Sequence, residues 1–207
     1  MSKKTINCGT LNSNQQLGKD YWNERWEKAE TGWDIGYSSP PIEKFMLQYE
    51  NKNNKILIPG CGNAHEVEFL LAQGFKNITV LDISNYATEI LKNRFMNFPE
   101  INVVCEDFFQ HTKKYDLIIE QTFFCAIPTI LRNDYAKKSA ELLNDGGMIM
   151  GLLFNKVFDK KGPPFGGTEA EYRFTFKKYF EILKMENCYN SIEPRKGNEL
   201  FINLKKK

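Results

Sequence analysis

The sequence predicts an α/β fold: a mostly parallel, seven-stranded sheet with an antiparallel last strand and helices on both faces. Three observations predict this class. Short apolar runs alternate with amphipathic stretches, a glycine turn follows the first run, and no helix-length segment separates the last two runs. Because 42% of the 207 residues are hydrophobic, the chain can bury one sizeable core. We expect residues 1–18 to form a loose polar arm and residues 19–207 to form one domain.

The predicted strands are short, mostly apolar segments. Near-continuous apolar strands are typical of a parallel sheet that helices cover on both sides. The segments are residues 55–58, 78–82, 101–105, 115–120, 148–154, 182–189 and 200–204. The last two should pair antiparallel and close one end of the sheet.

Between these strands, apolar residues recur at helical spacing. We expect helices over residues 63–73, after Ser84, over 133–143 and from 168 to about 180. Asn63 is the predicted N-cap of the first helix and Ser84 that of the second. The buried face of the second should consist of Ala87, Ile90, Leu91 and Phe95.

Composition excludes several classes of function. The net charge is only +2, from 28 basic and 26 acidic residues that are interleaved along the chain, so we expect no nucleic-acid partner. The five cysteines form no CxxC pair and neither histidine lies at ligand spacing from them, which predicts reduced thiols and no metal site. No apolar run is long enough to span a membrane, and the first residues lack an apolar signal segment. We therefore expect a cytoplasmic protein without membrane attachment.

A glycine turn, Pro59-Gly60-Cys61-Gly62, follows the first predicted strand. Glycine lets the backbone approach a ligand closely, and the helix start expected after it would offer free N–H groups and positive potential. In a Rossmann-like sheet, ligands bind beyond the carboxyl ends of the strands, near the point where the strand order reverses. Gly60 and Gly62 are therefore candidate contacts for a nucleotide-like cofactor.

Two carboxylates follow the next strands. Asp82 ends the second strand, where it can accept hydrogen bonds from both hydroxyls of a ribose. Asp107 follows the third strand and precedes Phe108 and Phe109, so a carboxylate would lie near an adenine amino group and a ring near the adenine face. Three strand ends thus point to an adenosine.

The last position of the glycine motif bears on the identity of the cofactor. A dinucleotide motif needs Gly or Ala there, whereas this chain has His65, and we expect no second domain for a nicotinamide substrate. S-adenosyl-L-methionine is therefore favoured. The alternatives are an NAD(P)-dependent oxidoreductase and a non-catalytic cofactor-binding module.

All three tryptophans of the chain lie before the first predicted strand. Trp22 and Trp26 are one helical turn apart, and Trp33 follows in a Gly32-Trp33-Asp34 segment. A sulfonium is a cation, which electron-rich rings within about 6 Å attract. Equally open is the interpretation that the indoles only pack a helix onto the sheet.

Eight short motifs, in constant order and spacing from about Tyr21 to Leu200, carry a family resemblance. They are WNERW (22–26), GWDIG (32–36), PGCG (59–62), LDIS (81–84), EDFF (106–109), QTFFCA (121–126), GPPF (162–165) and PRKG (194–197). In these motifs the chain resembles the thiopurine S-methyltransferase family, and within it the plant and bacterial halide, thiocyanate and thiol methyltransferases.

The resemblance implies a Rossmann-like class I methyltransferase that binds S-adenosyl-L-methionine and a small-molecule acceptor. It implies cofactor contacts for Trp22, Trp26, Trp33, Gly60, Asp82, Asp107 and Phe108. It also places Gln121 beside the reacting methyl group, so that Gln121 is a candidate for both cofactor binding and catalysis. Halide-type members usually have tyrosine at position 121 and often at position 154, where this chain has Gln121 and Phe154. Both candidate catalytic positions lack the phenol, so halide preference does not carry over.

Methyl transfer from a sulfonium is an in-line displacement with a good leaving group, so alignment and a dry cavity suffice. A thiol with a pKa near 8.5 is partly thiolate at neutral pH, and an anion such as hydrosulfide, thiocyanate or halide needs little or no proton removal. We therefore expect a small sulfur nucleophile or related anion as the acceptor, and neither a metal nor a His–carboxylate pair is required.

Other residues have two interpretations each. The loop 162–167 is either a lid with a Gly166-Gly167 hinge or a plain crossover loop, and Arg195-Lys196 either attracts an anion or forms a surface turn. His65 either contacts the cofactor carboxylate or lies at a helix start. We expect Cys61 to be structural and Cys125 to be a small apolar filler.

Overall fold

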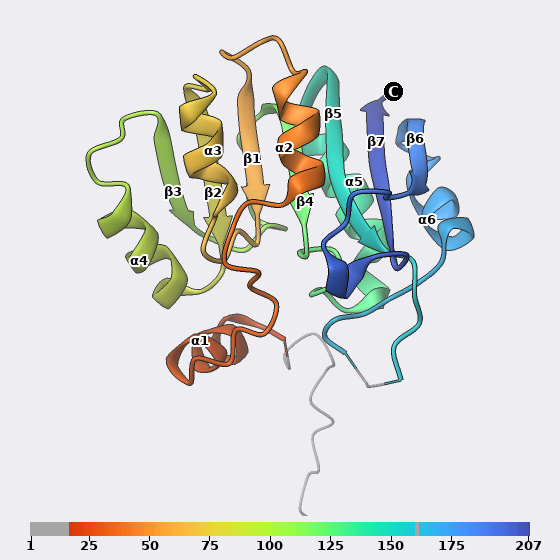
Figure 1. Ribbon diagram of the computed structural model, residues 1–207, viewed down its shortest axis with the longest axis horizontal. Helices are drawn as coiled ribbons and strands as arrows, with labels where there is room; N and C mark the ends of the chain where they lie inside the picture. The colour runs from red at the N-terminus through yellow and green to blue at the C-terminus, as the bar shows by residue number, and fades with distance from the viewer. Residues whose placement is uncertain (1–16, 160–161) are drawn as a thin grey trace, which may run out of the picture.

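The computed structural model describes residues 17–159 and 162–207 and has one seven-stranded sheet in the order β3-β2-β1-β4-β5-β7-β6 (Figure 1). Its strands are β1 Lys55–Pro59, β2 Asn77–Asp82, β3 Ile101–Cys105, β4 Tyr115–Gln121, β5 Leu143–Phe154, β6 Phe180–Asn187 and β7 Glu199–Lys206. β1 to β5 pair in parallel, and β7 is antiparallel to both β5 and β6. The predicted fold class is confirmed; residues 1–16 of the predicted arm lie outside the described residues.

The sheet's strand order reverses between β1 and β4. The chain runs outward from β1 through β2 to β3 and returns to lay β4 on the other side of β1. The loops after β1 and β4 therefore leave in opposite directions and open a crevice at the carboxyl ends of the strands. The fold thus places the glycine turn at the mouth of this crevice.

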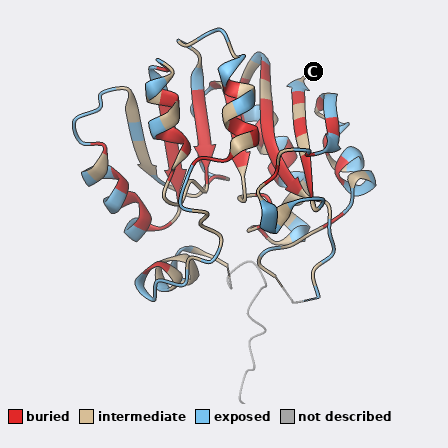
Figure 2. Ribbon diagram, in the orientation of Figure 1, coloured by how far each residue is buried: buried red, intermediate tan, exposed pale blue. Residues whose placement is uncertain are grey.

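Helices cover both faces of the sheet (Figures 1 and 2). They are α1 Lys19–Glu27, α2 Pro40–Leu47, α3 Glu66–Ala72, α4 Asn85–Arg94, α5 Arg132–Leu142 and α6 Glu169–Phe176. α2, α3 and α4 bury apolar side chains in a core cluster on one face, and α5 and α6 do so in a second cluster on the other face. β1 to β5 and β7 supply side chains to both clusters, as expected for a doubly covered sheet, whereas the side chains of the edge strand β6 pack in the second cluster alone.

The first helix, α1, lies beyond the carboxyl ends of the strands rather than on a face of the sheet (Figure 1). The Ser84 hydroxyl at the start of α4 donates to Asn23 Oδ1 of α1 at 2.7 Å. The same hydroxyl accepts from Ala87 N at 3.2 Å, which confirms Ser84 as the predicted N-cap. One residue therefore both caps α4 and fixes α1 over the crevice.

Two local predictions are wrong, and one helix was not predicted. α3 begins at Glu66 with His65 as its N-cap, and Asn63 lies before the helix, where its amide donates to Asp34. Ile90 is 40% exposed, so it does not share the buried face of α4. Helix α2 was not predicted, although Pro40 at its first position is a known start signal.

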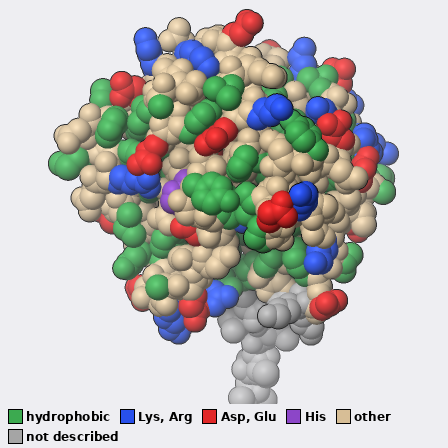
Figure 3. Space-filling view, in the orientation of Figure 1, with side chains coloured by type: hydrophobic (Ala, Val, Ile, Leu, Met, Phe, Trp, Pro, Cys, Tyr) green, Lys and Arg blue, Asp and Glu red, His purple; other side chains and the backbone are tan. Residues whose placement is uncertain are grey.

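The helices and the surface charge of the structure agree with the composition. Within residues 17–159 and 162–207, no helix has the length and apolar character needed to cross a bilayer. On the face shown in Figure 3, acidic and basic side chains are interspersed rather than gathered by sign.

Candidate functional site

A cavity of about 570 Å³ is lined by residues that follow the carboxyl ends of the strands and by residues of α1. We call it the large cavity. Its lining includes every predicted site residue except Gln121: Trp22, Trp26, Trp33, Gly60, Gly62, Asp82, Asp107, Phe108 and Phe154. Residues far apart in the sequence therefore meet around one space, as the motifs predict.

The glycine turn forms one wall of the large cavity. Gly60 and Gly62 have φ angles of +55° and +52°, a region that favours glycine. A β-carbon on Gly60 would stand 2.3 Å from the ring of Phe123. One on Gly62 would stand 3.6 Å from Trp33 Nε1 and 3.8 Å from the Trp26 ring. The backbone of the glycine turn therefore faces the part of the large cavity between the turn and the indoles.

The predicted helix start at this turn is not present. Residues 63–65 intervene, and α3 begins only at Glu66. His65 Nε2 lies 2.7 Å from Asp34 Oδ1, and Gly36 N donates to the same oxygen at 2.8 Å. Burial opposes the charged form of Asp34, but the hydrogen bonds from Gly36, Asn63 and His65 outweigh it and lower its pKa. His65 therefore lies at the helix start and holds Asp34.

Asp82 lies at the end of β2 and is only 8% exposed. Its Oδ1 accepts from Ser84 N at 2.9 Å and its Oδ2 from Gly62 N at 3.1 Å. Burial raises its pKa, and these backbone hydrogen bonds work against that shift. A carboxylate has about four acceptor positions, so Asp82 can hold the glycine turn and still accept from a ligand hydroxyl.

The end of β3 supplies Asp107 and two rings. Asp107 Oδ1 accepts from Phe109 N at 2.9 Å, which orients the carboxylate at the cavity wall. The Phe108 ring is only 2% exposed and is stacked on Tyr135 with centroids 5.3 Å apart. Phe109 packs edge-on against Phe108 at 5.5 Å and is half-buried. Phe109 therefore offers more ring surface to the cavity than Phe108 does.

The indoles form a cluster over the glycine turn. Trp33 makes edge contacts with Trp22 at 5.5 Å and with Trp26 at 6.0 Å between ring centroids. All three line the large cavity, and of the three only Trp26 is buried. The indoles thus pack against one another beside α1 and also line the cavity, and their contact with a sulfonium stays a prediction.

The other end of the large cavity is apolar except for one cation. Arg195 donates to the carbonyl oxygen of Trp33 at 3.0 Å and lies 3.6 Å from the Glu199 carboxylate. Its guanidinium stands 5.6 Å from the ring centroid of Phe154. Lys196, by contrast, is exposed and pairs with Glu193. Of the predicted basic pair, only Arg195 belongs to the cavity.

The loop 162–167 closes this end of the cavity. Phe165 N donates to Cys125 O at 2.7 Å, and Arg132 donates to the carbonyl oxygens of Phe165 and Gly166 at 3.1 and 2.9 Å. A β-carbon on Gly166 would stand 1.6 Å from the carbonyl oxygen of Lys156, so this glycine permits close packing. Gly166 therefore belongs to an anchored segment, and its conformation gives no support to a hinge.

One charged residue that sequence reasoning missed lies at the end of β4. Glu120 is fully buried, and its Oε1 accepts from the backbone N–H groups of Phe123 and Phe124 at 2.9 and 2.8 Å. Its Oε2 accepts from the Tyr135 hydroxyl at 2.7 Å. Burial raises its pKa to about 7. The signal was a lone acidic residue at the end of an apolar strand.

Glu120 fixes a tight turn, residues 121–125, that we call the β4 turn. Thr122 in this turn has a φ of +60°, which is rare for a β-branched residue. Thr122, Phe123 and Cys125 line the large cavity. Burial raises the pKa of Cys125 to about 12 and that of Cys61 well above its usual range, so neither thiol is an active nucleophile.

Gln121 is the predicted site residue that lies elsewhere. Leu117 and Ile119 of β4 pack in the cluster under α2 and α3, whereas Ile118 packs on the opposite face. Side chains alternate along a strand, so Gln121 follows Leu117 and Ile119. It lines a second space of about 40 Å³ beside the glycine turn, which we call the small cavity.

The comparison with known proteins decides the family. The sequence profile of Thiopurine S-methyltransferase (TPMT) matches residues 17–205. The chain belongs to the thiopurine S-methyltransferase family. Probable thiol methyltransferase 2 of Arabidopsis thaliana is 31% identical over 191 residues, which cover 89% of this chain and 84% of that protein. Thiocyanate methyltransferase 1 of Brassica oleracea is 30% identical over the same length and shares. Thiopurine S-methyltransferase of Photobacterium profundum is 22% identical over 201 residues, 89% of this chain and 94% of that protein.

Solved structures show the same fold at low sequence identity. The 1,6-didemethyltoxoflavin-N1-methyltransferase of Burkholderia thailandensis has a TM-score of 0.74 at 13% identity and covers 99% of this chain and 98% of its own. Magnesium protoporphyrin IX methyltransferase (ChlM) from Synechocystis PCC 6803 has a TM-score of 0.73 at 14% identity, covering 96% and 99%. The fold is therefore that of class I methyltransferases.

Membership in the thiopurine S-methyltransferase family makes the chain an S-adenosyl-L-methionine-dependent methyltransferase of a small nucleophile. It decides against the NAD(P)-dependent oxidoreductase and the non-catalytic module. The geometry fits the cofactor, because Gly60 has no room for a side chain, Gly60 and Gly62 both have positive φ angles, and two strand-end carboxylates line the same cavity.

Proposed function

We propose that this methyltransferase acts on a small thiolate or a related anion: hydrosulfide, thiocyanate or halide. The observation that carries the proposal is the large cavity itself. At one end are the glycine turn, two carboxylates and the indole cluster, and at the other an apolar pocket with the single cation Arg195 among the described residues that line it there. Relatives at 30 to 31% identity are named as thiol and thiocyanate methyltransferases.

At the cofactor end, each wall has a separate task. Gly60 and Gly62 would give backbone contact, Asp82 would accept from the ribose hydroxyls, and Asp107 would accept from the adenine amino group, with the rings of Phe108 and Phe109 beside it. Bound S-adenosyl-L-methionine supplies a methyl group on a positively charged sulfur. Trp22, Trp26 and Trp33 provide electron-rich faces for that charge.

At the acceptor end, the chain orients an anion and excludes water. Phe154 and Phe158 meet edge to face at 5.1 Å and form an apolar wall, with Pro163, Pro164 and Pro194 completing it. An apolar wall strips water from a small nucleophile, and Arg195 attracts negative charge to it. An already ionised nucleophile needs no base, and Cys125, a titratable residue of the cavity wall whose pKa burial raises to about 12, does not supply one.

We also propose that the protein works in the cytoplasm and without a nucleic-acid partner. The near-balanced charge of +2 supports this. So do free thiols at Cys61, Cys105, Cys125 and Cys188, which suit a reducing compartment.

A two-part experiment tests the proposed function. Calorimetry with S-adenosyl-L-methionine and S-adenosylhomocysteine measures cofactor binding, and headspace chromatography after incubation with iodide, thiocyanate, hydrosulfide and small thiols identifies the methylated product. We expect binding of both nucleosides and volatile product from sulfur acceptors. Cofactor binding without product from any of the four acceptor types would contradict the acceptor class.

A further inference from the structure

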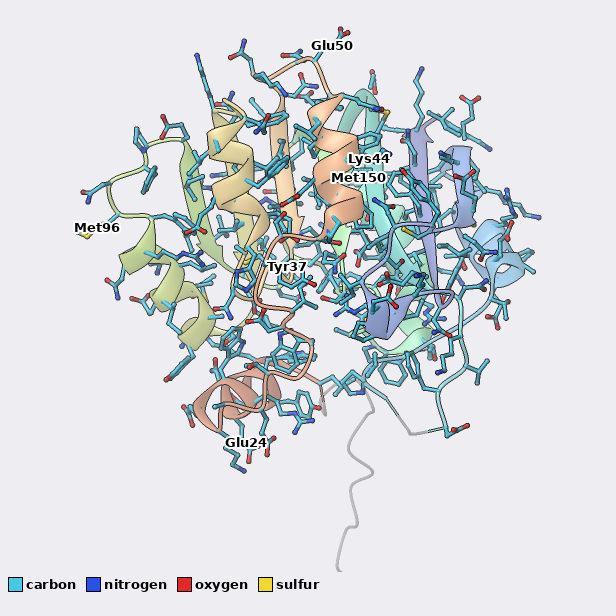
Figure 4. All side chains as sticks on the ribbon, in the orientation of Figure 1. Glu24, Tyr37, Lys44, Glu50, Met96 and Met150 are labelled. Atoms are coloured by element: carbon cyan, nitrogen blue, oxygen red, sulfur yellow. The ribbon has the colours of Figure 1, made fainter. Side chains whose placement is uncertain are left out.

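Arg132 lies where segments of the acceptor end meet, although it lines neither cavity. It is the first residue of α5, which packs on the face of the sheet opposite α2, the helix that carries Lys44 in Figure 4. Its guanidinium stands 4.8 Å from the ring centroid of Phe124 in the β4 turn and 5.4 Å from that of Tyr172 in α6. The side chain of Arg132 therefore contacts both the β4 turn and α6.

From this position Arg132 reaches the loop 162–167. Its Nη2 donates to the carbonyl oxygens of Phe165 and Gly166 at 3.1 and 2.9 Å. The same loop is joined to the β4 turn by Phe165 N, which donates to Cys125 O at 2.7 Å. Hydrogen bonds from a charged donor are stronger than those between neutral groups. Arg132 therefore fixes the loop against the β4 turn.

The loop that Arg132 fixes contributes a wall of the acceptor end. Pro163 and Pro164, directly before Phe165, line the large cavity. Phe154 of the same end is held by Tyr172, whose hydroxyl donates to Phe154 O at 2.7 Å. Arg132 thus holds the loop that carries the two prolines and packs on the ring of the residue that holds Phe154.

The hydrogen bonding of Arg132 is not what stability alone would select. Within residues 17–159 and 162–207 it forms no ion pair with a carboxylate. Its Nε is buried and has no hydrogen-bond partner in that part of the chain. An unpaired buried donor costs about 1 to 3 kcal/mol, and residues that carry such a cost cluster at functional sites. The cost favours a role for Arg132 in activity as well as in folding.

We propose that Arg132 is a positioning residue for methyl transfer: it holds the loop 162–167 against the acceptor end and so sets how tightly the acceptor binds. This inference rests on the proposed function and extends it to a residue outside the cavity. An in-line displacement depends on alignment, and a shift of about 1 Å in a positioning segment can cost much of the rate. A looser loop would also admit water, which solvates an anionic nucleophile. Acceptor binding should therefore depend on Arg132, whereas the strand-built cofactor end should not.

Steady-state kinetics with thiocyanate and hydrosulfide, at saturating S-adenosyl-L-methionine, tests this role. Arg132→Met keeps much of the apolar length of the side chain but removes its donors and its charge. It should raise the acceptor KM about fivefold and leave the affinity for S-adenosylhomocysteine, measured by calorimetry, within about twofold. A residue that only stabilises the fold would change both quantities together or neither.

Arg173→Met is the matched control. Arg173 also donates to a backbone carbonyl of another element, Met185 O at 3.0 Å, but it lies on α6 and lines neither cavity. Its substitution should leave the acceptor KM and the cofactor affinity unchanged. If Arg132→Met does not fold, Arg132→Lys takes its place. Lysine keeps a donor and the charge but loses the planar group beside the two rings, so it should show the same split to a smaller degree.

Hydrogen exchange, followed by mass spectrometry, reports on the loop itself. Peptides that span residues 162–167 should exchange about tenfold faster in Arg132→Met than in wild type, and no faster in Arg173→Met. Unchanged exchange, an unchanged acceptor KM, or equal losses of acceptor and cofactor binding would overturn the inference. Wild type that bound S-adenosylhomocysteine but methylated neither acceptor would instead overturn the proposed function, and the exchange rates would still decide whether Arg132 holds the loop.

Discussion

The two ends of the large cavity are built in different ways. The cofactor end consists of strand ends and the turns directly after them, with Gly60, Asp82 and Asp107 each fixed by backbone hydrogen bonds or close packing. The acceptor end consists of Phe154 at the end of β5 and of residues 155–159, 162–165 and 194–195, held by contacts such as those of Arg132 and Arg195. Strand ends give a rigid, shared cofactor site, whereas loops can change acceptor preference without disturbing the sheet.

The largest expected effect belongs to the rigid end. Gly60→Ala should lower S-adenosylhomocysteine affinity more than about a hundredfold and destabilise the fold by about 2 kcal/mol or more, because a β-carbon would strain the turn and meet Phe123 at 2.3 Å. Calorimetry and urea unfolding measure the two effects. Gly74→Ala is the control: Gly74 has a φ of +82° but nothing within 4 Å of its β-carbon, so it should show the strain alone. Equal losses in both variants would contradict the account of the glycine turn.

The second prediction concerns Glu120, at the boundary between the two ends. Its carboxyl pKa rises from 4.5 to about 7 on folding, so the folded chain keeps this proton while the unfolded chain loses it. Stability should therefore fall as pH rises from about 4.5 to about 7, by about 3 kcal/mol over the window.

Urea unfolding of wild type and Glu120→Gln, at pH 5 and pH 8, measures this contribution as a difference. Glutamine keeps acceptors for Phe123 N and Phe124 N but does not titrate, and all other carboxyls are common to both proteins. The wild type should lose more stability between the two pH values than the variant. Parallel pH profiles would show that Glu120 is not the group responsible.

The third prediction separates the two ends by kinetics. Asp82→Asn should reduce cofactor affinity about tenfold, since one charged acceptor is lost, and should leave the KM of the acceptor within about twofold. Asp107→Asn makes the same change at the other carboxylate of this end. It should also reduce cofactor affinity, but by less than Asp82→Asn. A raised acceptor KM with unchanged cofactor affinity would contradict the claim that the two ends bind their ligands separately.

The smallest effect is expected at the loop-built end. Arg195→Met should lower kcat/KM for thiocyanate about fivefold by removing the local cation, while Arg195→Lys restores most of it. Lys196→Met removes a neighbouring exposed cation paired with Glu193 and should have no effect. If both Met variants lose activity equally, the effect is one of net charge and not of position.

The cofactor end was more predictable from the sequence than the acceptor end, for physical reasons. A strand such as β3 carries its own pattern, and its predicted bounds, residues 101–105, agree with the structure. The places of Asp82 and Asp107 could be predicted because each lies at or just after the end of a strand, and the carboxyl ends of parallel strands meet at one edge of the sheet. The contacts of Arg195 with Trp33 and of Arg132 with Phe165 join residues far apart in sequence, and no local pattern announces them.

Asn63 and Gln121 show what the sequence signals could and could not place. Asn63 is an N-cap residue by type, but α3 begins only at Glu66, and the Asn63 amide donates to Asp34, which is far away in the sequence. The position of Gln121 was within reach of sequence reasoning, because strict alternation along β4 places it on the same face as Leu117 and Ile119. The family resemblance placed Gln121 beside the reacting methyl group, by analogy with the tyrosine that halide-type members usually have there, and this role stays a prediction.

The conformation of Thr122 has a consequence for how this protein can change. A β-branched residue held at a φ of +60° costs about 1 to 3 kcal/mol, and it sits where the walls of both cavities join. Glycine at this position would remove the backbone strain, but it would also make the segment between the two cavities more flexible. Higher stability and higher activity therefore place opposite demands on residue 122.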